Sequence, residues 1–281
     1  MIDKRTSIGV TILTIIMTFM EMTALPAALF CNIQIRDIEP IYFSLMINFI
    51  FAFALCYVCR KTIIKEWNFG LQFQNILIGL KRYGIPSLVT TLIVAVAFCI
   101  GLSPFNNKPT IYRVIVEGVV YYISVAIMEE IYLRGLLQNI IEKWFGKRDN
   151  ATLYAVIISS ALFGFGHIFG ALGQPILTII CKAVWATALG VYFGAVYVKT
   201  RNLWIPIILH FVVDLCGIPF CFSKSNQYPT IGLVFCLIMY LLLGIYGIYI
   251  IHKNKDNFCP IYKHLRVESS IKKITLPYGF M

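Results

Sequence analysis

The chain has 281 residues, of which 59% are hydrophobic and only 13% are charged. Soluble globular domains are about 45–50% apolar and about 25% charged, so this composition excludes a water-soluble domain and indicates a membrane protein. The formal net charge is +11, and the positions of the basic residues along the chain decide what that charge means.

A helix needs about 20 mostly apolar residues to cross the hydrocarbon layer of a bilayer. Such runs predict an all-α polytopic membrane protein with about eight transmembrane helices, at 8–31, 41–59, 85–102, 115–140, 151–170, 176–198, 203–222 and 229–251. No small-residue cleavage site follows the first run, which favours a retained span over a signal peptide. We therefore expect one transmembrane domain at 1–252 and a basic cytoplasmic tail at 253–281.

The segments between the runs predict the topology. The basic, aromatic-rich stretch 60–84 is typical of an interfacial or re-entrant segment, whereas 103–110 and 221–228 are turn-rich external loops. Of the 24 Lys and Arg residues, 18 fall in the N-terminus, alternate loops and the tail, and only four in the other loops. The positive-inside rule then predicts cytoplasmic termini. The net charge reflects topology and attraction to anionic lipid, not nucleic-acid binding.

The cysteines and glycines are more ordinary. The nine cysteines are scattered, mostly in apolar runs where Cys packs as a small hydrophobe, and Cys56 and Cys59 have no second pair at zinc-site spacing. The glycine pairs 166/170 and 190/194 have the small-xxx-small spacing that lets membrane helices approach closely. The usual glycine content of membrane helices explains these pairs equally well, but in both cases we expect a tight bundle around 120–215.

Ionisable residues within the predicted spans are the most informative, because a charge at the bilayer centre costs at least about 2.5–3.5 kcal/mol. We interpret Glu21, Glu117 and Lys182 as structural or boundary residues. The other six form a candidate site: Glu129, Glu130, Arg134, His167, His210 and Asp214.

Helix geometry predicts how these six are arranged. Residues four apart share a helix face, so Glu130 and Arg134 can form an ion pair, while the adjacent Glu129 points elsewhere and needs a partner from another helix. The same spacing places His210 and Asp214 on one face of a later helix.

Two chemistries fit this set. In the first, Glu129 deprotonates a water that His167 orients, while His210 and its neighbour stabilise an oxyanion. In the second, Glu129, His167, His210 and Asp214 supply ligands for a divalent metal, most plausibly zinc, which acidifies the water. The residues leave both mechanisms open.

Three motifs occur in order on consecutive apolar segments: Glu129-Glu130-x-x-x-Arg134, Phe163-x-x-x-His167 and His210-x-x-x-Asp214. Together with the lead-in Thr200-Arg201-Asn202-Leu203-Trp204-Ile205-Pro206, this set resembles the CPBP (CAAX protease and bacteriocin-processing) intramembrane proteases, which include the type II CAAX prenyl endopeptidases. The resemblance covers about 115–220.

This resemblance implies an all-helical intramembrane endopeptidase, named metalloprotease in some descriptions, that acts on a peptide or lipidated protein in a bacterial plasma membrane. It implies that Glu129 is the catalytic base and His167 its partner. His210 and residue 214 would stabilise the oxyanion, and Glu130 and Arg134 would shape the site.

One residue departs from the family pattern. The prenyl-protein branch favours Asn where this chain has Asp214, and an ionised Asp cannot donate a hydrogen bond to an oxyanion. Asp214 would then be protonated, bind a metal or orient His210. Two other functions remain in competition: a non-enzymatic bacteriocin-immunity or scaffold protein, and a proton- or cation-coupled transporter, which the lack of internal repeats disfavours.

Overall fold

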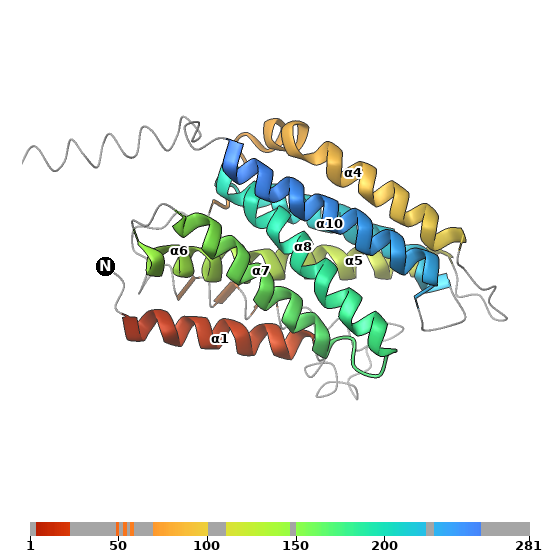
Figure 1. The fold of residues 1–281 in the computed structure, drawn as a ribbon, viewed down its shortest axis with the longest axis horizontal. Helices are drawn as coiled ribbons and strands as arrows, with labels where there is room; N and C mark the ends of the chain where they lie inside the picture. The colour runs from red at the N-terminus through yellow and green to blue at the C-terminus, as the bar shows by residue number, and fades with distance from the viewer. Residues whose placement is uncertain are drawn as a thin grey trace, which may run out of the picture.

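The computed structural model describes residues 4–22, 70–100, 111–146, 150–222 and 228–253, with short pieces at 49–50, 53–54 and 57–58. All regular structure in these ranges is helical (Figure 1). The helices are α1 (Lys4–Met22), α4 (Ile76–Ile100), α5 (Ile111–Glu130), the π-helix η1 (Ile131–Gln138), α6 (Asn139–Phe145), α7 (Ala151–Phe169), α8 (Ile176–Thr200), α9 (Trp204–Asp214), the 3₁₀ helix η2 (Leu215–Phe222) and α10 (Thr230–Lys253).

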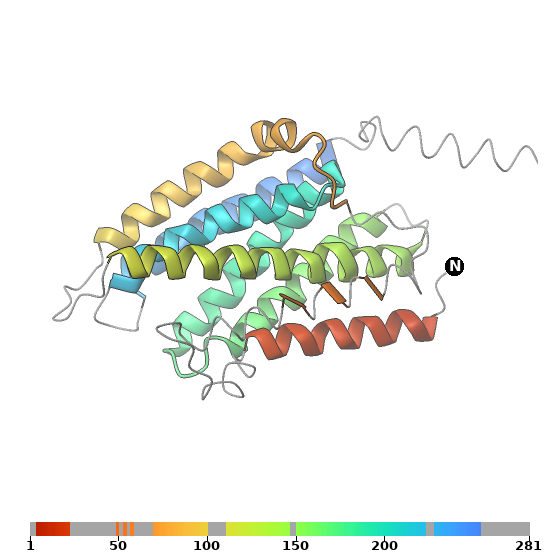
Figure 2. The same cartoon turned by 180° about the vertical axis from the view of Figure 1, so that it is seen from behind.

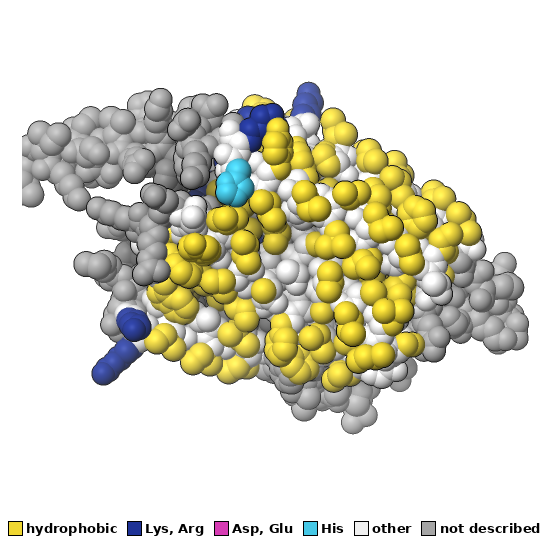
Figure 3. All heavy atoms as spheres, viewed as in Figure 1, with side chains coloured by type: hydrophobic (Ala, Val, Ile, Leu, Met, Phe, Trp, Pro, Cys, Tyr) yellow, Lys and Arg dark blue, Asp and Glu magenta, His cyan; other side chains and the backbone are white. Residues whose placement is uncertain are grey.

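Four of the described helices, α4, α7, α8 and α10, are long and apolar enough to cross a membrane. Their outward faces carry large exposed apolar side chains, such as Leu92 and Val96 on α4 and Leu242 and Ile245 on α10. Figure 3 shows the same property for one whole face of the molecule, where hydrophobic side chains cover the middle of the bundle. Exposing so large an apolar surface to water is unfavourable, whereas lipid chains solvate it. The chain is an integral membrane protein.

The other predicted spans are described less completely. Helix α1 covers part of the run at 8–31. Most of the run at 41–59, the loop 103–110, most of 221–228, the first part of 60–84 and the tail from 254 lie outside the described residues. The run at 203–222 is divided into the short helix α9 and the 3₁₀ helix η2.

The predicted start of the third span, at residue 85, is wrong, because α4 begins at Ile76. The prediction placed 76–84 in an interfacial segment on account of Lys81 and Arg82. Both side chains are exposed, while Tyr83 and Ser87 of the same helix are buried. Long basic side chains at a helix end reach the interface while their backbone continues the span, so they do not mark where the helix starts.

Helix α8 forms the centre of the bundle, between α7 and α10. Small residues allow both contacts: a Cβ at Gly190 would lie 2.9 Å from Cβ of Ser160 on α7, and one at Gly247 of α10 would lie 2.9 Å from Cα of Tyr192. The backbones therefore approach more closely than larger side chains would permit. The contact at Gly190 agrees with the tight bundle expected around 120–215.

Helices α5, η1 and α6 follow one another without a break, and α5 also contacts α9. Figure 2 shows α5 lying along the face of the bundle that is hidden in Figure 1. The junction between α5 and η1 lies at Glu130 and Ile131, near the middle of this run. It places the paired glutamates beside α7, α8 and α9.

Candidate active site

The site lies in the interior of the bundle, where three helices contribute four buried ionisable side chains. Glu129 and Glu130 end α5, Arg134 belongs to η1, and His210 belongs to α9. These four residues are 4% exposed or less, among apolar neighbours. Such burial of ionisable groups is expensive unless they are paired, so the contacts between them decide what the site can do.

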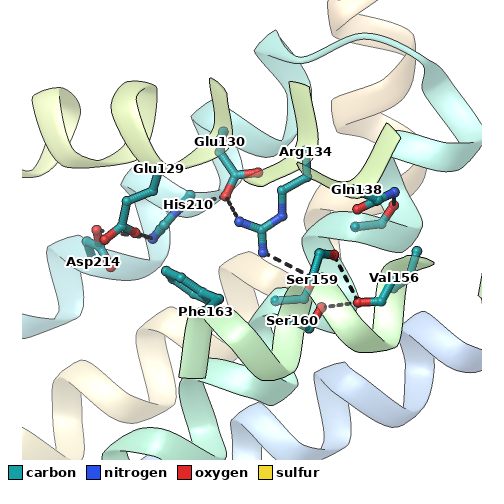
Figure 4. Close-up of polar contacts among 12 residues, drawn as sticks. Glu129, Glu130, Arg134, Gln138, Val156, Ser159, Ser160, Phe163, His210 and Asp214 are labelled. Atoms are coloured by element: carbon teal, nitrogen blue, oxygen red, sulfur yellow. Dashed lines mark hydrogen bonds and ion pairs between the residues drawn. The ribbon is translucent and has the colours of Figure 1, made fainter. Parts of the chain in front are cut away.

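His210 is the centre of this group. Its Nδ1 lies 2.8 Å from Oε1 of Glu130, a hydrogen bond between residues 80 positions apart. Its Nε2 faces two further carboxylates, 3.4 Å from Oε2 of Glu129 and 3.6 Å from Oδ2 of Asp214. Figure 4 shows Glu129, His210 and Asp214 converging from two helices. Because carboxylates only accept hydrogen bonds, both ring nitrogens are directed as donors.

Arg134 fixes the other side of Glu130. Its Nη1 donates to Glu130 Oε1 at 2.9 Å, which confirms the predicted i,i+4 ion pair, and its Nη2 donates to the carbonyl of Gly190 at 3.1 Å. The guanidinium also lies over the rings of Phe163 and Phe193, 5.1 and 5.7 Å from their centroids. These contacts hold the arginine rigidly. One carboxylate oxygen thus accepts from both Arg134 and His210.

His167 lies on α7, and the ring of Phe163 separates it from His210. Phe163 lies edge-on to His167, with ring centroids 4.4 Å apart, and 6.0 Å from the ring of His210. His167 Nδ1 lies 3.0 Å from the carbonyl oxygen of Phe163. Since a carbonyl only accepts, Nδ1 carries the proton, and in the neutral ring Nε2 is left as an acceptor. The two histidines are therefore set up for opposite roles, one to donate and one to accept.

Two further residues belong to the site that the sequence did not single out for it. Phe193 of α8 stacks on His210, with centroids 4.8 Å apart and an interplanar angle of 25°. Lys182 of the same helix interacts electrostatically with Glu129 and Asp214. A phenylalanine in an apolar run carries no sequence signal. Lys182 did carry one, as a charge within a span, but its partners lie on other helices.

Glu21 and Glu117 fall in α1 and α5, and their side chains lie outside the described residues.

The candidate zinc ligands Glu129, His167, His210 and Asp214 are not arranged around a common point that a metal ion could occupy. No group of three or more His, Cys, Asp or Glu side chains in the described part of the chain is arranged to hold a metal ion. A histidine binds a metal through a ring lone pair. His210 directs both nitrogens to carboxylates, and His167 uses Nδ1 on a backbone carbonyl. The arrangement does not fit a metal centre, and no step below is derived through one.

Comparison with known families identifies one domain within the chain. Residues 110–216 match the family model described as type II CAAX prenyl endopeptidase Rce1-like. The chain contains an Rce1-like domain. The matched segment is less than half of the chain, yet it includes all six candidate residues, from Glu129 to Asp214. No curated protein and no solved structure matched the chain.

The Rce1-like domain confirms the resemblance read from the ordered motifs. The family implies an intramembrane endopeptidase, and hence a peptide or protein as substrate. The roles of the individual residues do not follow from the family match, and they are taken up as proposals.

Proposed function

We propose that this protein is an intramembrane endopeptidase in which Glu129 activates a water for attack on a peptide bond. The single observation that carries the proposal is the buried His210, with Glu130 on one ring nitrogen and Glu129 on the other. A rigid donor beside a buried carboxylate is the pair of groups that peptide hydrolysis requires.

The first step forms the bond between water and the carbonyl carbon. Glu129 takes one proton of the water, and Nε2 of His167, an acceptor in its neutral form, receives a hydrogen bond from the other. The carbonyl oxygen becomes an oxyanion, and the Nε2–H group of His210 donates to it. The distances of 3.4 and 3.6 Å from that nitrogen to Glu129 and Asp214 are long for hydrogen bonds, so its N–H group is available to a substrate oxygen without a turn of the ring.

The second step breaks the carbon–nitrogen bond. Glu129 returns its proton to the leaving nitrogen, which departs as an amine, while the carbonyl is restored as a carboxylic acid. Throughout, Glu130 accepts from Nδ1 of His210 and Arg134 holds Glu130. Asp214 acts as an acceptor that orients His210, a role open to an ionised carboxylate where oxyanion donation is not.

The proposal includes a membrane topology. We infer about eight crossings, one transmembrane domain over 1–252, a basic cytoplasmic tail at 253–281 and cytoplasmic termini, in a bacterial plasma membrane. The substrate is a membrane-associated peptide or lipidated protein. Four described helices of membrane-spanning length and the ordered motifs support these inferences.

Glu129→Gln tests the proposal, because it keeps the shape of the side chain and removes its basicity. Membranes from cells expressing the wild type or this variant are compared by mass spectrometry of new protein termini. We expect fragments that appear with the wild type and fall at least about a hundredfold with Glu129→Gln, as removal of a general base predicts.

Glu142→Gln on α6 is the matched control, since Glu142 pairs with Arg201 away from the site. It should leave the fragments unchanged. Equal cleavage by wild type and Glu129→Gln, at equal amounts of folded protein, would overturn the enzymatic proposal. A transporter would instead show solute flux in vesicles without new termini, and a scaffold would keep its phenotype with alanine at Glu129 and His210.

A further inference from the structure

Two side chains of η1 bind the backbone of α8 at its paired glycines. Nε2 of Gln138 donates to the carbonyl of Gly194 at 3.3 Å, and Nη2 of Arg134 donates to the carbonyl of Gly190 at 3.1 Å. The two donors are four residues apart on η1, and the two acceptors are four residues apart on α8. The two hydrogen bonds are therefore successive links between the same pair of helices.

Glycine at position 194 leaves room for the amide of Gln138. A Cβ there would lie 2.8 Å from Oε1 of Gln138 and 3.1 Å from Cγ1 of Val156 on α7. A carbonyl oxygen has two lone pairs, so Gly194 can accept the helical bond of α8 and the bond from the amide together. The glycine pair 190/194 thus does more than bring helices close, because its carbonyls receive donors from η1.

Gln138 is a polar residue at an apolar position. Its side chain is 1% exposed, and the neighbouring Leu136 and Leu137 are as deeply buried. An amide is costly to bury unless it makes hydrogen bonds, whereas a leucine would fill the same place without that cost. The bond to the Gly194 carbonyl therefore accounts for a glutamine here.

The same helix carries the arginine of the candidate site. In a π-helix, which bonds residues five apart, side chains four positions apart lie on nearly the same side. Arg134, four residues before Gln138, donates to Oε1 of Glu130 at 2.9 Å, and that oxygen accepts from Nδ1 of His210 at 2.8 Å. A shift of η1 along α8 would move the guanidinium and so disturb both contacts of Glu130.

We infer that Gln138 is a positioning residue of the active site: bound to the Gly194 carbonyl, it fixes the register of η1 on α8 and thereby the place of Arg134 beside Glu130. The inference rests on the proposed endopeptidase function for its effect on the rate. The contact between Gln138 and Gly194 does not depend on that function, so it can be tested separately.

A double-mutant cycle tests the contact without any cleavage assay. The thermal midpoint of the purified full chain in detergent is measured for the wild type, Gln138→Ala, Gly194→Ala and the double variant. Each single change should lower the midpoint by about 3 °C or more. The double variant should lose clearly less than the sum, because the methyl group at position 194 then enters the space that the amide has left.

Gly232→Ala is the matched control for this cycle. A Cβ at Gly232 of α10 would meet Cδ1 of Phe98 at 2.8 Å, a clash as close as the one at Gly194 but with a different partner. Its effect should add to that of Gln138→Ala, since the two sites share no contact. Strictly additive shifts for Gln138→Ala and Gly194→Ala would overturn the inference.

Activity provides the second readout, with a peptide identified from the wild-type fragments as substrate. Gln138→Met keeps the length of the side chain and removes the amide. It should lower kcat about tenfold and leave KM unchanged, because it displaces catalytic groups without touching the substrate. Leu137→Ala, which removes buried apolar packing from the same helix, should lower the thermal midpoint and leave kcat of the folded protein unchanged.

Equal kcat for Gln138→Met and the wild type would also overturn the positioning role. The two proposals fail separately. A wild type that makes no fragments, combined with coupled midpoints, would refute the endopeptidase and support the contact between Gln138 and Gly194. Cleavage that depends on Glu129, combined with uncoupled midpoints, would do the reverse.

Discussion

One oxygen of the Glu130 carboxylate accepts two hydrogen bonds. Its Oε1 accepts from Nη1 of Arg134 and from Nδ1 of His210. Arg134 is in turn held by the Gly190 carbonyl and by two aromatic rings. The chain of contacts runs from the backbone of α8 to the imidazole, so the orientation of His210 is fixed by residues that need not touch a substrate.

Removing the charge of Arg134 should therefore lower the stability of the protein. Arg134→Met leaves Glu130 buried without its cation, and breaking one side of a buried pair costs about 3–5 kcal/mol. Chemical unfolding in detergent measures this loss. Glu130→Gln combined with Arg134→Met should recover part of it, because no unpaired charge remains.

Arg201→Met is the comparison for that experiment. Arg201 pairs with Glu142 at 3.2 Å and also donates to Oδ1 of Asn139 at 3.3 Å, but the side chains of the Arg201–Glu142 pair are about one-fifth exposed. A pair of this kind is worth about 1 kcal/mol or less. Equal losses for Arg134→Met and Arg201→Met would contradict the interpretation that the buried pair organises the site.

Some contacts of the site can be predicted from the sequence, and others cannot. The Glu130–Arg134 pair follows from spacing within one helix, and it is present. The Glu130–His210 bond joins residues 80 positions apart, and nothing local encodes it. The stacking of Phe193 on His210 is likewise a product of how α8 packs against α9. Ionisable residues in apolar runs indicate a candidate site, while the contacts between them depend on tertiary structure.

At the scale of elements, the π-helix η1 is the distinctive feature. It begins directly after Glu130 and includes Arg134. Asn139, the next residue, donates through Nδ2 to the carbonyls of Arg134 at 2.8 Å and Gly135 at 2.9 Å, and it lies 3.0 Å from the hydroxyl of Tyr197. Single turns of π-helix recur at functional sites, and here the wider turn carries the arginine that holds Glu130.

Asn139→Leu should loosen this turn, because it keeps the size of the side chain and removes its hydrogen bonds. We expect a loss of about 1–3 kcal/mol in stability. Hydrogen exchange measured by mass spectrometry should show faster exchange over 131–138 than in the wild type. Asn150→Ala, which changes an exposed residue before α7, should leave exchange in that segment unchanged. Unaltered exchange in Asn139→Leu would show that the amide does not support the π-helix.

The sequence predicts the elements well where composition alone decides them. Runs of apolar residues identify α7, α8 and α10 to within a few residues. They fail where a helix changes type or continues past charges. Examples are the π-helix, the change from α9 to a 3₁₀ helix at Leu215, and the early start of α4, whose exposed basic side chains Lys81 and Arg82 do not interrupt the helix.

At the scale of the whole molecule, segments far apart in the sequence meet at one end of the bundle. Arg201, after α8, pairs with Glu142 of α6. Lys199 donates to the carbonyl of Ile251 at the end of α10, and Leu203 donates to the carbonyl of Gly70 before α4. Lys and Arg side chains appear at this end in Figure 3 and are absent from the apolar middle of the face shown. The ends that carry the basic loops are thus brought together in space, as one membrane side requires.

This arrangement makes the topology testable. Single cysteines introduced into a variant lacking the native ones should divide into two classes by their reaction with a membrane-impermeant maleimide in intact cells. A cysteine at Asn150, beside the end where Arg201 meets Glu142, should be protected until the cells are opened. A cysteine at Gly173, in the turn between α7 and α8 at the opposite end, should react in intact cells. The reason is electrostatic: basic loops are retained on the cytoplasmic side during insertion. Reversed labelling would place the basic end outside and contradict the positive-inside assignment, whereas labelling of both positions in intact cells would contradict the antiparallel crossing of α7 and α8.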